Sequence, residues 1–276
     1  EMGPNVVSWV GGFVNGALIY GDCCEPAAGN VLALSEPDGP RANISYGWAA
    51  DSDATGRRWA TANDYAVQVL DFTTGRGYSR GLNESGEYFN VSDVAWSPDA
   101  TEVWLLGWTN AEGYLLVRYS SDATLTELDR RVLGSSDGDF PTDWFSFAGR
   151  LSDGTTVLTR SSGSSEAGAT ELTFLAPDGS DDDRQSPWQL PAQVNSVSVS
   201  PDGTTLAYVA DDTAYLVREG QQPVEWGTDM MSVWFVTTPP SPIGTSDCPP
   251  PDNEYGYAAW TFTDLDGDGV SERVWV

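Results

Sequence analysis

The stretch "SVSVSPDGTTLAYVADDTAYLVRE", from Ser196 to Glu219, contains the pattern that decides the fold. Three runs alternate apolar and polar residues, and the short sequences PDG and DD separate them. Alternation with a period of two residues predicts strands that bury one face, and Pro, Asp and Gly in succession favour a tight turn. A fourth short run, PVEWG, begins at Pro223. This segment therefore predicts four antiparallel strands joined by short turns.

Similar segments recur along the chain, each with an apolar run, a turn at an aspartate and a second β-rich run. The copies are "GWAADSDATGRRWATA" from Gly47, "VAWSPDATEVWLLGW" from Val94, "AGRLSDGTTVLTR" from Ala148 and "CPPPDNEYGYAAWTF" from Cys248. The marker aspartates Asp53, Asp99, Asp153, Asp202 and Asp252 are 46, 54, 49 and 50 residues apart, and a further step of 48 back reaches Asn5. We expect these aspartates to serve their own turns through local hydrogen bonds.

A repeat of about 50 residues is the length of one four-stranded propeller blade. Six markers in 276 residues predict an all-β fold, a six-bladed β-propeller of four-stranded antiparallel blades in a single domain covering residues 1–276. The last repeat, from about Met230, supplies only three apolar runs. Its blade is therefore expected either to have three strands or to receive its outer strand from the amino-terminal residues.

The segments "WSPDA" and "VSPDGTTLAYVA" resemble the TolB-type propeller repeat, whose common form is Trp-Ser-Pro-Asp-Gly followed by a strand. The resemblance covers Ser97 to Leu105 and Ser200 to Tyr208 well, and the copy at Ser152 in part. It implies the propeller fold and is nearly silent about function. The turns differ from the sialidase Asp-box, because "DATEVW" lacks its glycine and "DGTTLA" lacks its aromatic residue.

The net charge of −28 restricts the partners of this protein, because the 13 basic residues are all Arg and the chain has neither Lys nor His. A nucleic acid is excluded as a partner, since neutralising phosphates needs a basic face. An anionic membrane surface is disfavoured for the same reason, and no apolar run is long enough for direct membrane insertion. The charge indicates either solubility in a salty or extracellular setting or attraction of cations and basic partners.

The missing His and Lys also remove most catalytic arrangements, including a Ser/His/Asp triad, a Schiff-base lysine and a His-ligated zinc. Carboxylate pairs such as Asp51 with Asp53, Asp137 with Asp139, and Asp211 with Asp212 remain as candidates for a glycosidase acid and nucleophile. Acidic pairs in turns are expected in so acidic a chain. We therefore assign no catalytic residue.

The three cysteines, Cys23, Cys24 and Cys248, match no zinc spacing and no redox motif. Either Cys248 pairs with one of the adjacent two, or these two form a vicinal disulfide, or all three are thiols. The chain begins at Glu1 without an apolar segment, as a secreted protein does after signal removal and as an intracellular protein can. A disulfide would suit an oxidising compartment. We expect a secreted, periplasmic or cell-surface protein.

The carboxyl-terminal stretch "FTDLDGDGVSERVWV" places three aspartates at alternate positions between two strand-like runs. Alternate positions of a tight loop turn their oxygens toward one centre, and calcium prefers six to eight oxygen ligands. The expected ligands of a structural Ca²⁺ are Asp264, Asp266, Asp268, the carbonyl of Val270 and Glu272. An EF-hand is disfavoured, because Trp275 stands where its last Glu would be.

The loop instead resembles the calcium hairpin of FG-GAP repeats in integrin-type propellers, although that family usually has Asp at the position of Glu272. The alternative is an acidic turn that holds no ion.

The function expected from these features is that of a non-catalytic scaffold that binds a protein, small-molecule or glycan partner in an envelope or extracellular assembly. A carboxylate enzyme acting on glycans is the second interpretation, and a purely structural domain of a surface protein is the third. The tryptophans are expected mainly to pack between blades, with a few at loop ends serving recognition. They include Trp9, Trp48, Trp59, Trp96, Trp104, Trp144 and Trp234.

Overall fold

The computed structural model describes residues 7–14, 17–22, 30–34, 41–46, 49–71, 74, 76–82, 88–137, 140–162, 170–191, 193–230, 232–236, 260–263 and 272–275. Residues up to 46 and from 260 onward are described by their backbone alone. Throughout these ranges the regular structure is β, without a helix, and the paired strands are antiparallel. The fold class is therefore all-β, as the alternating runs predict. The chain divides into two compact units.

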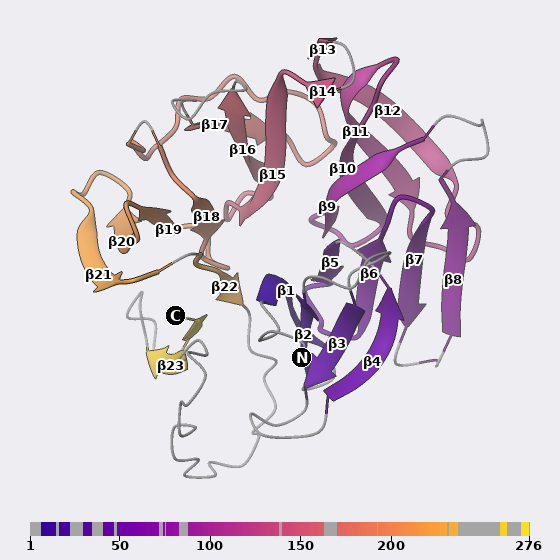
Figure 1. Cartoon of the computed structure of the whole chain (residues 1–276), viewed down its shortest axis with the longest axis horizontal. Coiled ribbons are helices and arrows are strands. Elements are labelled where there is room, and N and C mark those ends of the chain that lie inside the picture. Colours follow the sequence, from indigo (N-terminus) through magenta and orange to yellow (C-terminus); the bar gives the residue numbers. More distant parts are fainter. Residues whose placement is uncertain are drawn as a thin grey trace, which may run out of the picture. The chain divides into compact units, whose positions relative to one another are not determined.

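The first unit contains three four-stranded sheets, in which each strand pairs with the next one along the chain (Figure 1). Consecutive sheets contact each other through their first strands, β1 with β5 and β5 with β9. Residues 110–114 and 133–134 of the third sheet are assigned to the second unit. The strands are β1 (Val7–Val14), β2 (Ala17–Asp22), β3 (Asn30–Leu34), β4 (Arg41–Tyr46), β5 (Ala49–Ser52), β6 (Arg58–Ala62), β7 (Ala66–Asp71), β8 (Arg76–Gly81), β9 (Asn90–Trp96), β10 (Glu102–Thr109), β11 (Gly113–Ser120) and β12 (Glu127–Gly134).

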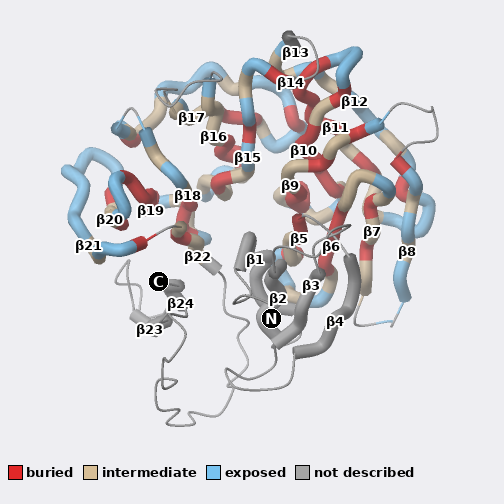
Figure 2. The backbone as a smooth tube through the Cα atoms, viewed as in Figure 1, coloured by how far each residue is buried: buried red, intermediate tan, exposed pale blue. Residues whose placement is uncertain are grey.

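Apolar residues of β5 to β11 form the core of this unit, and the outer strands β8 and β12 are mainly exposed or half-buried (Figure 2). The outer strands carry Arg76, Arg80, Arg130 and Arg131. Charged side chains on an edge strand disfavour pairing with another chain. Four of the 13 arginines thus lie on outer strands, where a charged side chain hinders pairing with another chain.

The second unit contains a three-stranded sheet, a four-stranded sheet, a small carboxyl-terminal sheet and a two-stranded ribbon. The first strands of its two larger sheets, β15 and β18, contact each other. Residues 196–228 form β18 to β21 in consecutive order, which confirms the four predicted strands. The strands are β13 (Ser136–Asp137), β14 (Phe140–Pro141), β15 (Asp143–Arg150), β16 (Thr156–Ser162), β17 (Thr170–Leu175), β18 (Ser196–Val199), β19 (Thr205–Ala210), β20 (Thr213–Arg218), β21 (Val224–Thr228), β22 (Phe235–Val236), β23 (Trp260–Thr263) and β24 (Glu272–Trp275).

The carboxyl-terminal sheet has three described strands, but their order is β22-β24-β23. The last strand therefore lies in the middle, unlike the simple order of the four-stranded sheets. Thr263 at the end of β23 is the partner of Glu272 at the start of β24. Residues 264–271 thus connect two paired antiparallel strands, as expected for a hairpin.

The turns β5–β6, β9–β10 and β18–β19 follow one hydrogen-bonding pattern. The amide of Ala100 donates to the Ser97 carbonyl and that of Gly203 to the Ser200 carbonyl, both closing four-residue turns. In the β5–β6 turn the equivalent donor is Gly56, and its acceptor is the carbonyl of Asp53.

Asp53 consequently occupies in its turn the position that Ser97 occupies in the β9–β10 turn. The prediction that Asp53 corresponds to Asp99 was therefore wrong, because the two positions differ by two residues along the turn. The physical reason is that a carboxylate oxygen and a hydroxyl oxygen can each accept the hydrogen bond of a backbone amide in the turn. The amide of Glu102 donates to the hydroxyl of Ser97, and the amide of Arg58 donates to the carboxylate of Asp53. The markers Asn5 and Asp252 lie outside the described residues.

Candidate functional site

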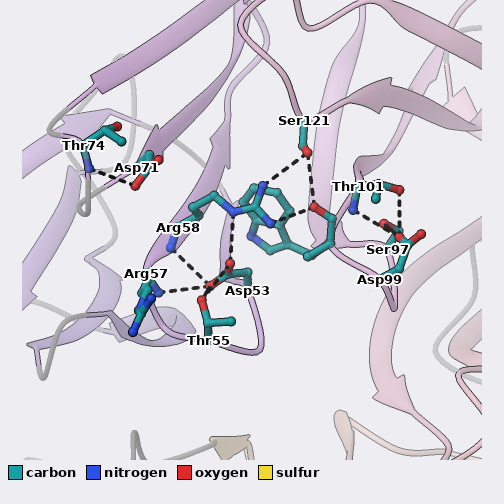
Figure 3. Close-up of polar contacts among 12 residues, drawn as sticks. Asp53, Thr55, Arg57, Arg58, Asp71, Thr74, Ser97, Asp99, Thr101 and Ser121 are labelled. Atoms are coloured by element: carbon teal, nitrogen blue, oxygen red, sulfur yellow. Dashed lines mark hydrogen bonds and ion pairs between the residues drawn. The ribbon is translucent and has the colours of Figure 1, made fainter.

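The turn aspartates Asp99 and Asp202 are used by their own turns. The carboxylate of Asp99 accepts hydrogen bonds from the Ser97 hydroxyl at 2.8 Å and from the amide and hydroxyl of Thr101 at 3.1 and 2.8 Å (Figure 3). Asp202 accepts equivalent bonds from Ser200 and Thr204. The Ser97 hydroxyl, together with Thr101, lowers the pKa of Asp99. These side chains therefore have a structural task.

The carboxylate pairs considered for a glycosidase are likewise engaged in structure or lie beyond what is described. Asp51 accepts the backbone N–H of Trp96 at 3.0 Å, and Asp53 forms an ion pair with Arg58 at 3.1 Å. Asp211 and Asp212 form the tight β19–β20 turn, with φ angles of 50° and 57°. The side chain of Asp137 and all of Asp139 lie outside the described residues.

Arg58 joins the sheet of β5–β8 to the sheet of β9–β12. Its Nε donates to Asp53 (Figure 3). Its Nη2 donates to the carbonyl of Ala100 at 2.8 Å, and its guanidinium lies 4.7 Å from the ring centroid of the buried Trp96. Burial acts to raise the pKa of Asp53, but the donors from Arg58, Thr55 and Arg57 outweigh it and lower this pKa. The network holds two sheets together.

Arg118 repeats this combination of groups. Its guanidinium lies 5.8 Å from the ring centroid of the buried Trp104, and its Nε donates to Glu102 at 2.8 Å. The indole Nε1 of Trp104 donates to the same carboxylate at 2.8 Å. The bond from Arg118 lowers the pKa of Glu102 against the effect of burial.

The most exposed aromatic pair in the described part of the chain is formed by Tyr65 and Tyr88. These two residues are 61% and 46% exposed, and their rings meet edge to face, with centroids 6.2 Å apart and planes at 86°. Tyr65 lies between β6 and β7, and Tyr88 lies just before β9. We call Tyr65, Tyr88 and Asp64 the tyrosine surface.

Asp64 brings the two tyrosines together, although they come from separate connections. One carboxylate oxygen accepts the hydroxyl of Tyr88 at 3.1 Å, and the other accepts the amide of Val91 at 3.0 Å. The side-chain oxygen of Asn63 accepts the amide of Tyr65 at 2.9 Å, while the Tyr65 carbonyl accepts the amide of Leu82 at 2.8 Å. The backbone of the tyrosine surface is therefore held in place on both sides.

Local desolvation and the neighbouring Asp64 raise the pKa of Tyr88 to about 12. The Tyr88 hydroxyl therefore stays protonated at neutral pH and keeps donating to Asp64. An aromatic pair that is both exposed and held in place suits recognition, because little side-chain freedom remains to be lost on binding.

Sequence reasoning missed the tyrosine surface. The available signal was an aromatic residue directly after Asn63 and Asp64, at a turn where small polar residues are usual. Of the tryptophans expected to pack between blades, Trp59, Trp96 and Trp104 are buried, whereas Trp144 on β15 is 40% exposed. The side chains of Trp9 and Trp48 lie outside the described residues. In the second unit, Trp144 packs edge to face on Tyr114, with centroids 6.2 Å apart.

The expected calcium ligands cannot be placed as a group. Asp264, Asp266, Asp268 and Val270 lie outside the described residues, and so does the side chain of Glu272. The same holds for Cys23, Cys24 and Cys248. Elsewhere, within the described residues, no group of three or more acidic or cysteine side chains is placed to hold a metal ion. The described part of the chain also contains no helix long and apolar enough to cross a membrane.

No family model and no curated protein matches the sequence. Among solved structures, the chain is similar to one from the crystal structure of the mitotic checkpoint complex, with 17% sequence identity and a TM-score of 0.38. The match covers 60% of this chain and 46% of that chain, so this protein corresponds to less than half of that structure's length. A likeness at this TM-score decides nothing about function. The class defined by the structure itself is an all-β protein of repeated three- and four-stranded antiparallel sheets.

Proposed function

We propose that this protein is a six-bladed β-propeller of the TolB type, in a single domain, that binds a partner without catalysing a reaction. Repeated four-stranded sheets that contact each other through their first strands support the propeller, since neighbouring blades pack in that way. The turns at Ser97 and Ser200 share one hydrogen-bonding pattern, which supports a true repeat.

The observation that carries the binding function is the tyrosine surface. Large aromatic side chains dominate recognition because they supply contact area at low cost in conformational entropy. Tyr65 and Tyr88 are 61% and 46% exposed, yet Asn63 bonds the Tyr65 amide and Asp64 bonds both the Tyr88 hydroxyl and the nearby Val91 amide. A rigid sheet that presents such a pair on its connections is the usual plan of a binding module.

The proposed setting is secreted, periplasmic or on the cell surface, and the partner is a protein, a small molecule or a glycan. A net charge of −28 argues against nucleic acid. The β23–β24 hairpin is proposed to hold a structural Ca²⁺ through Asp264, Asp266, Asp268, the Val270 carbonyl and Glu272. Support comes from the pairing of Thr263 with Glu272, which joins the ends of the acidic stretch in one hairpin.

A pull-down from an envelope extract tests the binding function. The wild-type chain, the double variant Tyr65→Ala/Tyr88→Ala and the control Leu128→Ala are compared, since Leu128 is exposed on β12, a strand that contributes no residue to the tyrosine surface. We expect a partner that wild type and control retain and the double variant loses, and the same difference with the purified partner. Equal retention by the double variant would overturn the proposal for this surface. Hydrolysis of a glycan by the purified chain would overturn its non-catalytic part.

A further inference from the structure

We infer that the tyrosine surface binds a guanidinium or ammonium group, supplied by an Arg or Lys side chain of a basic protein segment. The inference rests on the proposed binding function and specifies its ligand. It depends on three features of the molecule: the contacts of its own partly buried Arg58 and Arg118, the groups at the tyrosine surface and the charge of the chain.

Two arginines of the described chain show how this protein holds a cation. Arg58 faces the ring of Trp96 at 4.7 Å and bonds a carboxylate at 3.1 Å. Arg118 faces the ring of Trp104 at 5.8 Å and bonds a carboxylate at 2.8 Å. In both cases the cation meets an aromatic face, whose negative potential attracts it, and a carboxylate that bonds its N–H groups. An aromatic ring beside a carboxylate is thus a cation-holding combination that occurs twice.

The tyrosine surface presents the same two groups to the solvent. Tyr65 and Tyr88 meet edge to face, with planes at 86°, and both residues remain exposed. Asp64 lies beside this pair, since its carboxylate accepts the Tyr88 hydroxyl at 3.1 Å. Exposed aromatic rings beside a negative charge attract a cation, as aromatic cages attract ammonium ligands.

The charge of the whole chain favours a cation over the other ligand classes. With 41 acidic and 13 basic residues, the protein attracts a basic segment from a distance and repels an anionic one. A neutral glycan could stack on the same rings but would gain nothing from this field. The groups at the tyrosine surface, two rings and one carboxylate, therefore fit a basic segment best.

Fluorescence anisotropy with defined peptides tests the inference. The probe is a short labelled peptide of alternating Gly and Arg, and its matched control has citrulline, a neutral residue of the same shape, in place of Arg. We expect the Arg peptide to bind at least about tenfold more tightly than the citrulline peptide. Binding should weaken as salt rises, because the attraction is electrostatic.

Four variants separate the contributions of the Tyr65 ring, the Asp64 carboxylate and the net charge to binding of the Arg peptide. Tyr65→Phe keeps the ring and should bind like wild type, whereas Tyr65→Leu keeps apolar bulk without an aromatic face and should weaken binding about three- to tenfold. Asp64→Asn should weaken it to a similar extent. Glu225→Gln removes one charge from the exposed strand β21 and should leave the affinity unchanged. Since Tyr65 is largely exposed, its variants are expected to fold.

Equal binding of the citrulline peptide, or unchanged binding by Tyr65→Leu, would overturn the inference. An equal loss in Glu225→Gln would also overturn it, because net charge alone would then explain the affinity. A neutral partner that still depends on Tyr65 and Tyr88 would refute the cation while leaving the binding function in place. If the pull-down yields no tyrosine-dependent partner, the proposed binding function itself fails.

Discussion

Gly203, in the β18–β19 turn, should be the least replaceable of the turn glycines. Its φ is +75°, and a Cβ atom there would lie 2.5 Å from the backbone nitrogen of Ser152 and 2.6 and 2.7 Å from the Cα and carbonyl carbon of Leu151. These are backbone atoms of the neighbouring β15–β16 turn, so no side-chain rotation relieves the contact. Gly203→Ala therefore combines a strained backbone conformation with a clash between two sheets.

Two substitutions separate these costs. Gly220 has a similar φ of +70° with nothing within 4 Å of an added Cβ, so Gly220→Ala should cost only the conformational part, about 1 kcal/mol. The clash adds about 1–3 kcal/mol for overpacking, which gives about 2–4 kcal/mol for Gly203→Ala. Ala100 occupies the turn position of Gly203 at a φ of 56°. Ala100→Gly should stabilise the protein by about 0.5–1 kcal/mol.

Urea denaturation followed by fluorescence measures the three effects, with the slope m checked for constancy. In thermal melts each kcal/mol should move the midpoint by about 2–4 °C for a chain of this size. If Gly203→Ala costs no more than Gly220→Ala, the close approach of the two turns is wrong. If Ala100→Gly destabilises, the equivalence of the turn positions is wrong.

Three further predictions concern the charge of Asp153, the geometry of the β19–β20 turn and the proposed calcium site. The Thr155 amide and Arg184 lower the pKa of Asp153 to about 2, from an ordinary value of 3.8. The stabilisation by the Asp153 charge is therefore complete above about pH 3.8 and lost as the pH falls through about 2, so the difference in unfolding free energy between wild type and Asp153→Asn should shrink over this window. A constant difference down to pH 2 in urea titrations would contradict this. Replacing Asp211 and Asp212, at φ 50° and 57°, by Asn-Gly should raise stability by about 1 kcal/mol in thermal melts, and a lower midpoint would refute the turn. Calcium at a thousandfold excess over its Kd should stabilise the wild type by about 4 kcal/mol and Asp266→Asn much less. An unchanged wild-type midpoint in chelator, without heat of binding in calorimetry, would exclude the metal site.

The strands and turns were predictable because their signals are local. Alternation along residues 196–219 decides which face of each strand is apolar, and the Pro-Asp-Gly turn needs only its own neighbours. The four strands from β18 to β21 accordingly lie where the sequence places them. The register of the repeat at Asp53 was not predictable from the marker alone. The carboxylate of Asp53 accepts the amide of Arg58, just as the hydroxyl of Ser97 accepts the amide of Glu102. The amino-acid sequence does not show that these two side chains are equivalent.

The candidate site was not predictable, because it depends on bringing separate connections together. Tyr65 follows β6, and Tyr88 comes after two further strands. The sequence shows neither that Asp64 bonds both Tyr88 and Val91 nor that the two rings stay exposed. Trp96 and Trp144 have the same residue type, yet one is buried under Arg58 and the other is exposed.

By itself, the sequence determined the all-β class, the turn chemistry and the strongly negative net charge, since these follow from residue types and their spacing. Only the tertiary structure decided which aromatic residues face solvent, which arginines join two sheets and which glycine another backbone approaches. The physical reason is that burial and close contact are properties of paired surfaces. The strands that form these surfaces are separated along the chain and meet only when the sheets pack.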